Sequence, residues 1–218
     1  MTTYPIELKL AGRGALVVGG GQVAARKVAG LVEAGARVRV VGLDFCPELL
    51  ERQDVTREKR PYGPECLAGV SLVLACTDAR GVNAAVAADA RARGIWCNVA
   101  DEPEEGDFFV PAVLRRGELT VAVGTGGAAP GAAAALRDQL ASHLTPEWGI
   151  LVEELGRARR ILKERVPDAG LRRQILETLC SECSITLLAV RDREAWRRWF
   201  ERVTEYRLQG LADLPEVL

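Results

Sequence analysis

A glycine-rich turn, Gly19-Gly-Gly-Gln-Val-Ala24, has the residue types and spacing of a dinucleotide-binding motif. It fits the pattern G-x-G-x-x-A, in which Gly19 permits a tight turn and Gly21 lets a pyrophosphate approach the backbone. The residues after the turn have helical spacing, and a helix N-terminus offers free N–H groups and a partial positive charge to phosphates. The turn therefore predicts a dinucleotide site, and a purely structural glycine turn is the alternative.

An acidic residue at the end of the second strand usually binds the adenosine ribose in such a site. Here that strand is expected to end in Val41-Gly42-Leu43-Asp44, so Asp44 is the candidate. Its alternative role is to cap a helix that begins at Pro47. No basic residue follows this strand directly to bind a 2′-phosphate, and we therefore expect NAD rather than NADP as the cofactor.

Polar residues also follow three later strand-like runs, at Cys76-Thr77-Asp78, Asn98-Val99-Ala100-Asp101 and Gly124-Thr125-Gly126-Gly127. Ligands of doubly wound sheets bind outside the carboxyl ends of the strands, so these segments are expected to face the same crevice as the glycine turn. Asp101 is the candidate general base or metal ligand, and a cap on the turn before Pro103 is its structural alternative.

Two further interpretations concern helix starts and the last of these loops. Asp78 and Asn83 are expected to cap the helix that follows them. The loop Thr125-Gly126-Gly127 is expected to shape a substrate site, and a flexible turn into the next helix is the alternative.

These residues need a scaffold of alternating strands and helices, and the apolar pattern predicts one. Strands are expected at 15–19, 37–41, 71–75, 95–99, 108–110 and 119–123, and helices at 22–34 and 82–93. Strands that alternate with helices predict a parallel, doubly wound sheet. From Pro130 the pattern becomes helical, with helices expected at 130–143, 147–166, 171–179 and 193–207.

The predicted fold class is therefore α/β, with an N-terminal Rossmann-type parallel sheet followed by a central segment and a C-terminal helical domain. The expected boundaries are 1–112 for the Rossmann-type domain, 113–145 for the central segment and 146–218 for the helical domain.

The composition argues against several classes of function. The 218 residues carry a net charge of −1, so no overall field favours nucleic acid, and no apolar run is long enough to span a membrane. The N-terminus lacks the residue order of a signal peptide, and we expect a cytoplasmic protein. Cys180 and Cys183 form a lone C-x-x-C and His143 is the only histidine, so no metal site is expected and both cysteines are interpreted as core positions on a helix.

Several motifs in the same order and spacing resemble the siroheme synthase N-terminal domain family over roughly residues 3–145. This family comprises the precorrin-2 dehydrogenases, some of which are also sirohydrochlorin ferrochelatases. The motifs are Tyr4-Pro-Ile6, Gly19 to Lys27, Ala75 to Asp78, Asn83, Cys97 to Asp101, Phe108 to Pro111 and Val121 to Gly127.

The resemblance implies an NAD-dependent oxidation of precorrin-2, a tetrapyrrole, to sirohydrochlorin, with Asp101 as the acid–base residue. It implies NAD contacts at Gln22, Val23, Leu43 and Asp44, to which Thr77 is added as a cofactor-binding candidate. It also implies a homodimer in which the central segment makes the subunit contact. Family members often have serines where this chain has Gly124-Thr125, but Thr125 keeps a hydroxyl.

The chain ends at Leu218, without the methyltransferase domain that some siroheme synthases carry, so we expect another enzyme to supply precorrin-2. The sequence leaves open whether Fe2+ insertion is a second activity. A non-catalytic NAD-sensing Rossmann module is the alternative from another class, and it would explain the glycine turn but not Asp101. A dehydrogenase for another small substrate and a protein-interaction scaffold are weaker alternatives.

Overall fold

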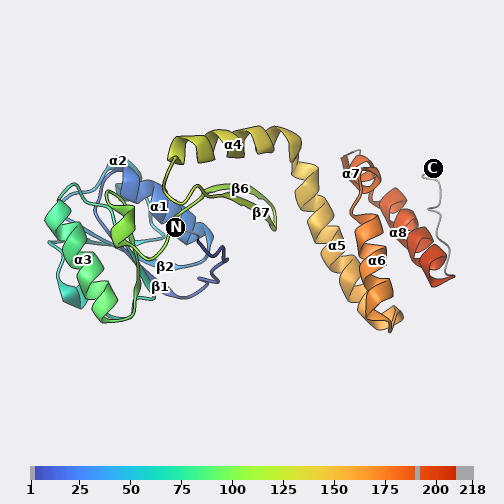
Figure 1. Cartoon of the computed structure of the whole chain (residues 1–218), viewed down its shortest axis with the longest axis horizontal. Helices are drawn as coiled ribbons and strands as arrows, with labels where there is room; N and C mark the ends of the chain where they lie inside the picture. The colour runs from blue at the N-terminus through green and yellow to red at the C-terminus, as the bar shows by residue number, and fades with distance from the viewer. Residues whose placement is uncertain (1–2, 190–191, 210–218) are drawn as a thin grey trace. The chain divides into compact units, whose positions relative to one another are not determined.

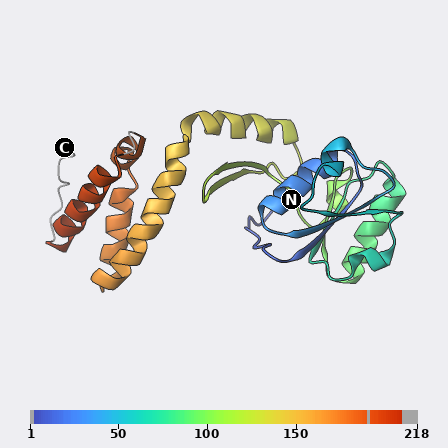
Figure 2. The same ribbon diagram turned by 180° about the vertical axis from the view of Figure 1, so that it is seen from behind.

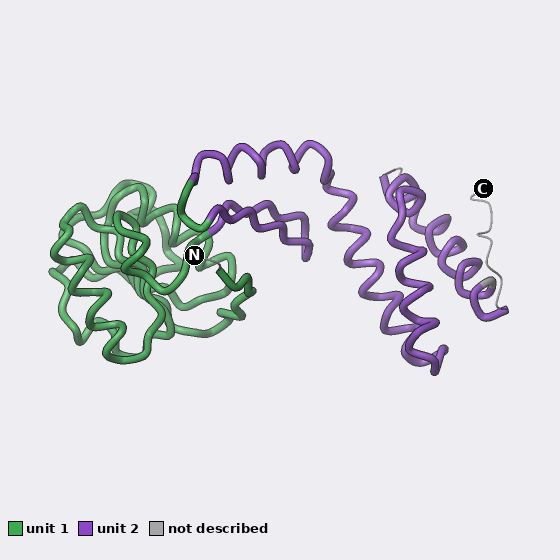
Figure 3. The backbone as a smooth tube through the Cα atoms, in the orientation of Figure 1, with its two compact units in different colours: residues 1–110, 126–128 green, residues 111–125, 129–218 purple. Residues whose placement is uncertain are grey.

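The computed structural model describes residues 3–189 and 192–209 (Figure 1 and Figure 2). The chain divides into two compact units (Figure 3). The first comprises residues 1–110 with 126–128, and the second comprises residues 111–125 with 129–218.

The first unit is built on a five-stranded parallel sheet in the order β3-β2-β1-β4-β5. The strands are β1 (Gly14–Val18), β2 (Arg37–Gly42), β3 (Thr56–Lys59), β4 (Leu72–Ala75) and β5 (Trp96–Val99). The register pairs Val18 with Val41 and with Ala75, and Ala75 with Val99. Four strands therefore end level with one another, and the residues that follow them meet at one edge of the sheet.

Helices cover both faces of this sheet because successive strand residues point to opposite faces. On one face, α1 (Gln22–Glu33) packs through Ala24, Val28 and Leu31 against a cluster that includes Val17 and Val40. On the other face, α3 (Arg80–Ala92) packs through a second cluster that includes Leu16 and Val73. Figures 1 and 2 show α1 and α3 on opposite sides of the strands. The short elements are α2 (Pro47–Leu50), η1 (Pro64–Leu67) and η2 (Pro103–Glu105).

The second unit combines a hairpin with helices. Strands β6 (Ala112–Arg116) and β7 (Leu119–Val123) pair antiparallel, and α4 (Pro130–His143) packs on them. Helices α5 (Pro146–Arg165), α6 (Ala169–Leu179), α7 (Glu182–Ala189) and α8 (Arg193–Leu208) follow. Their shared core includes Leu151, Ile175, Leu188 and Trp199. The α/β fold class with a helical C-terminal part is thus confirmed.

Some element predictions were wrong. Residues 108–110 form no strand, and the next strand, β6, begins at Ala112 and pairs with β7 in a separate antiparallel sheet instead of extending the parallel one. Two features prevent strand pairing here. The Phe108 carbonyl accepts a hydrogen bond of 2.8 Å from a side chain, Asn98 Nδ2, and Pro111 has no backbone N–H to donate to a neighbouring strand.

The edge strand β3 was missed because its sequence, Thr-Arg-Glu-Lys, has no apolar alternation. Helix α7 was missed as well, and with it the placement of the C-x-x-C pair. Cys180 is exposed at the end of α6, so its prediction as a core position was wrong, whereas Cys183 is half-buried on α7 and packs against the core of the helices. None of the helices in the described residues is both long and apolar enough to cross a membrane.

We predict that Gly20→Ala destabilises the protein while Gly30→Ala does not. A Cβ on Gly20 would overlap the backbone carbonyl of Asp44, which cannot move aside as a flexible side chain can, whereas a Cβ on Gly30 would meet no atom within 4 Å. We expect Gly20→Ala to lower the free energy of unfolding by about 2 kcal/mol or more. The helical control, Gly30→Ala, should leave it unchanged or raise it by up to about 1 kcal/mol. Urea denaturation measures both, and equal stability of the two variants would contradict the packing described.

Candidate functional site

The glycine turn lies between the end of β4 and the loop after β2. Gly19 has a φ of +122°, a conformation that favours glycine, and a Cβ there would overlap the carbonyl of Cys76. The Gly20 carbonyl accepts a hydrogen bond of 2.7 Å from the N–H of Cys46. The backbone of the turn therefore lies against the segments that follow β2 and β4, the two strands on either side of β1.

Gly21 leaves the N-terminus of α1 open to a ligand. It is the N-cap of α1, no side chain caps the helix there, and a Cβ on Gly21 would meet nothing within 4 Å. The first N–H groups of a helix need an acceptor, and an anion such as a pyrophosphate satisfies them. Gln22 and Val23 are exposed beside this N-terminus.

Gln22 is held by an acid that the sequence analysis did not identify. Its Nε2 donates to both carboxylate oxygens of Glu48, each at 2.8 Å. This hydrogen bond is the main reason why the pKa of Glu48 lies below its usual value. Glu48 stands in the first turn of α2, so the pair links the starts of two helices next to the expected phosphate position.

Leu43 and Asp44 both project into solvent after β2, and the side chain of Asp44 is 91% exposed. Lys59 Nζ lies 3.5 Å from Asp44 Oδ1, from the end of the missed strand β3. The structure thus places a cation beside the ribose candidate, although no basic residue follows β2 directly in the sequence. An ion pair this long and exposed contributes little to stability.

Asn83 is the organising residue at the ends of β4 and β5. Its side chain is fully buried, and its Oδ1 accepts from the N–H of Thr77 at 3.1 Å and from Thr77 Oγ1 at 2.7 Å. Its Nδ2 donates to the Thr77 carbonyl at 2.8 Å and to Asp101 Oδ1 at 2.7 Å. The prediction that Asn83 and Asp78 cap α3 was wrong, because the N-cap is Ala79 and it receives no side-chain cap.

Asp101 combines an anchored oxygen with access from solvent. Oδ1 is bound by Asn83, while the residue as a whole is exposed. Arg80 lies close by in an ion pair with Glu105, which is the main cause of its raised pKa, and Asp101 contributes to the same shift. The arrangement suits a carboxylate that exchanges protons with a ligand. None of the described residues forms a metal-binding cluster of His, Cys, Asp and Glu.

The loop Thr125-Gly126-Gly127 divides between the two units. Gly126 and Gly127 have φ values of +61° and +84°, and a Cβ on Gly127 would lie 2.6 Å from Phe109 Cε1. Thr125 Oγ1 accepts a hydrogen bond of 3.2 Å from the N–H of Ala129, immediately before α4. Phe109, which belongs to the motif Phe108 to Pro111, is thus the neighbour of Gly127.

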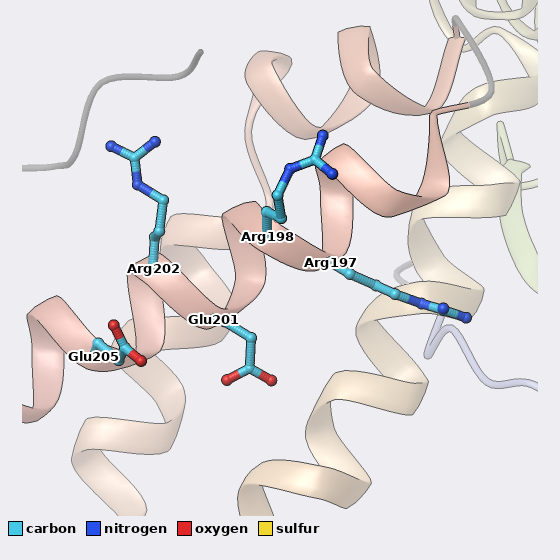
Figure 4. A pocket seen from close by; sticks show the side chains of 5 residues that line it. All are labelled: Arg197, Arg198, Glu201, Arg202 and Glu205. Carbon is cyan, nitrogen blue, oxygen red and sulfur yellow. The ribbon is translucent and has the colours of Figure 1, made fainter.

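Five charged side chains line a depression on α8 (Figure 4), namely Arg197, Arg198, Glu201, Arg202 and Glu205. In that view the two glutamates point away from Arg198 and Arg202. Glu201 also forms an ion pair with Arg165 at 2.9 Å, and Arg157 forms one with Glu154 at 2.6 Å. These mixed charges are typical of a solvated helical surface, and we place the candidate site in the first unit.

Comparison with known proteins supports the same assignment. Residues 6–112 match a family described as "Putative NAD(P)-binding". The chain is 41% identical over 182 residues to the siroheme synthase of Chromobacterium violaceum, which covers 82% of this chain and 39% of that protein. It is 39% identical over 214 residues to the siroheme synthase of Pseudomonas aeruginosa strain UCBPP-PA14, covering 96% of this chain and 45% of that protein.

The chain therefore spans less than half the length of these relatives. Among solved structures, SirC, precorrin-2 dehydrogenase, has the same fold, with a TM-score of 0.72, 23% sequence identity and coverage of 94% of this chain and 100% of that one. The chain is thus similar to siroheme synthases over most of its own length, and its residues 6–112 match a family described as NAD(P)-binding.

Proposed function

We propose that this protein is an NAD-dependent precorrin-2 dehydrogenase that produces sirohydrochlorin and uses Asp101 as its acid–base residue. The observation that carries the proposal is the fixed carboxylate of Asp101, bound through Asn83 at the same sheet edge as the open helix N-terminus at Gly21. The names of the related siroheme synthases and of the SirC structure support the choice of substrate.

The cofactor side of the proposal rests on the glycine turn. Gly19 makes the tight turn and Gly21 leaves room for the pyrophosphate, and the N–H groups of Gln22 and Val23 are the donors that would bind it. Leu43 and Asp44 would contact the adenosine ribose, and Thr77 would line the nicotinamide side. When bound, NAD+ supplies the hydride acceptor.

The oxidation of precorrin-2 requires a base, because converting a C–C single bond to a double bond releases a proton as well as a hydride. Asp101 would accept that proton, and the hydrogen bond from Asn83 Nδ2 holds one oxygen of its carboxylate in place. Thr125, Gly126 and Gly127 are proposed to contact the tetrapyrrole. We further propose that the enzyme is a cytoplasmic homodimer in which residues 113–145 form the subunit contact.

We predict that Asp101→Asn abolishes precorrin-2 oxidation without weakening NAD+ binding. Loss of a general base costs roughly 100-fold or more in rate, whereas the glycine turn is untouched. The assay follows sirohydrochlorin absorbance and NADH with enzymatically made precorrin-2, and binding of NAD+ is measured separately by calorimetry. The control is Asp54→Asn, at an exposed aspartate that forms an ion pair with Arg52 away from the candidate site, and this variant should keep wild-type turnover.

A second arm of this assay supplies Fe2+ as a substrate together with sirohydrochlorin. Siroheme formation faster than the spontaneous rate would add a ferrochelatase activity, and loss of that rate in Asp101→Asn would assign it to the same site. If the wild-type chain binds NAD+ but never turns over precorrin-2, the dehydrogenase proposal is wrong and a non-catalytic NAD-binding module is the better account.

We predict that the protein binds NAD+ at least about tenfold more tightly than NADP+, and that Asp44→Ala weakens NAD+ binding by about tenfold. A carboxylate that accepts hydrogen bonds from ribose hydroxyls makes charge-assisted hydrogen bonds. Losing them is expected to raise the Kd by about tenfold. Calorimetric titration with both nucleotides measures it. Equal or tighter binding of NADP+ would overturn the cofactor choice, and Lys59→Met would then show whether Lys59, 3.5 Å from Asp44, binds the 2′-phosphate.

A further inference from the structure

Lys27 is a half-buried cation in the first unit that the cofactor motif does not use. It lies on α1, between Ala24 and Val28, which both pack into the core. Its Nζ donates to Asn98 Oδ1 at 2.8 Å, and none of the described carboxylates lies within salt-bridge distance of it. Burial is the main cause of its lowered pKa. A lysine in such a place normally has a specific partner, because an unpaired buried charge is costly.

The partner, Asn98, is itself held on both sides. It is 4% exposed, near the end of β5, and its Nδ2 donates to the Phe108 carbonyl at 2.8 Å. The amide therefore connects Lys27 with the residues on both sides of Asp101, since Asn98 precedes Asp101 by three residues and Phe108 follows it by seven. The segment between them contains only the short helix η2.

Lys27 and Asp101 have opposite effects on the pKa of one buried thiol, that of Cys76. The thiol of Cys76 is buried after β4, and burial raises its pKa to about 11. Lys27 opposes this rise and Asp101 adds to it. The ammonium and the carboxylate are thus both close enough to Cys76 to affect one thiol, from α1 and from the loop after β5.

We propose that Lys27 is a positioning residue that links the cofactor-binding helix to Asp101 through the amide of Asn98. Helix α1 carries the expected phosphate site at its N-terminus and Lys27 in its second turn. Asn98 transmits the position of this helix to the segment 99–108, while Asn83 binds the Asp101 carboxylate itself. This inference rests on the proposed dehydrogenase function for its kinetic consequence, but not for the contact itself.

The test compares Lys27→Met, which keeps the length and packing of the side chain, with wild type in the full chain. We expect kcat for precorrin-2 oxidation to fall by roughly 10- to 100-fold, because small displacements of a catalytic group have effects of this size. The Kd for NAD+ should stay within about twofold, since the glycine turn is unaltered. Lys9→Met, at an exposed lysine outside the site, is the matched control and should keep wild-type kcat.

A double-mutant cycle shows whether Lys27 acts through Asn98. Asn98→Leu should lower kcat as Lys27→Met does, and combining the two changes should add nothing further to the loss. Independent, additive losses would overturn the proposed link. So would a Lys27→Met variant whose kcat is within about twofold of wild type, or one in which kcat and NAD+ affinity fall together, because that pattern indicates general damage to α1.

Hydrogen exchange gives a readout that does not depend on turnover. Backbone amides in residues 99–108 should exchange faster in Lys27→Met than in wild type or Lys9→Met, with and without NAD+. Unchanged exchange would overturn the link even if the enzyme is active. If wild-type protein does not oxidise precorrin-2 yet exchange responds to Lys27→Met, the proposed function fails and the structural link stands.

Discussion

The level ends of β1, β2, β4 and β5 are the constraint on which the candidate site depends. Parallel pairing sets Val18 beside both Val41 and Ala75, and Ala75 beside Val99, so residues from four distant parts of the sequence begin their loops at one edge. These ends lie so close together that a Cβ on Gly19 or Gly20 would overlap the carbonyls of Cys76 and Asp44. The crowded turn therefore requires glycine at both positions. A shift of one residue in the pairing would both reverse the faces of a strand and separate the turn from its neighbours.

Beyond the strand ends the backbone hydrogen bonds of the sheet stop, and the buried side-chain amides of Asn83 and Asn98 bind the loops that follow. Asn83 and Asn98 are each almost fully buried, and each binds a backbone carbonyl together with a side chain from another element. A buried amide is costly unless its donors and acceptors are satisfied, and once satisfied it restricts the loops it joins to few conformations. The loops that carry Thr77, Asp101 and Phe108 are therefore ordered by side chains, which is why an irregular segment can present a carboxylate in a fixed orientation.

The sequence indicated the parts of this arrangement that leave a periodic or compositional signal. The apolar runs of β1, β4 and β5, the G-x-G-x-x-A turn and the helix from Gln22 follow from such signals, and the register of a parallel sheet then determines where their ends lie. Strand β3 gave no signal because an edge strand can be polar, and the cation Lys59 was missed with it. Phe108 was assigned to a strand because aromatic residues favour strands, but its carbonyl is bound by Asn98 and no ladder forms. Asn83 was interpreted as a cap because spacing alone cannot show that a helical side chain reaches Asp101.

Lys27 illustrates how a half-buried cation with a single hydrogen-bond partner among the described residues can indicate a positioning role. An apolar side chain of the same length would fill its place between Ala24 and Val28 without the desolvation that lowers the lysine pKa, and replacing buried charges by apolar groups is often neutral or stabilising. What an apolar side chain cannot supply is a donor to Asn98 Oδ1, which would otherwise be a buried acceptor left without its partner. The side-chain amide of Asn98 is thus the hydrogen-bond partner of the Lys27 ammonium. This amide joins α1, whose N-terminus is the proposed phosphate site, to the end of β5, which leads to Asp101. The proposed cofactor site and the proposed acid–base residue are thus supported by two sets of hydrogen bonds, one through Asn98 and the other through Asn83.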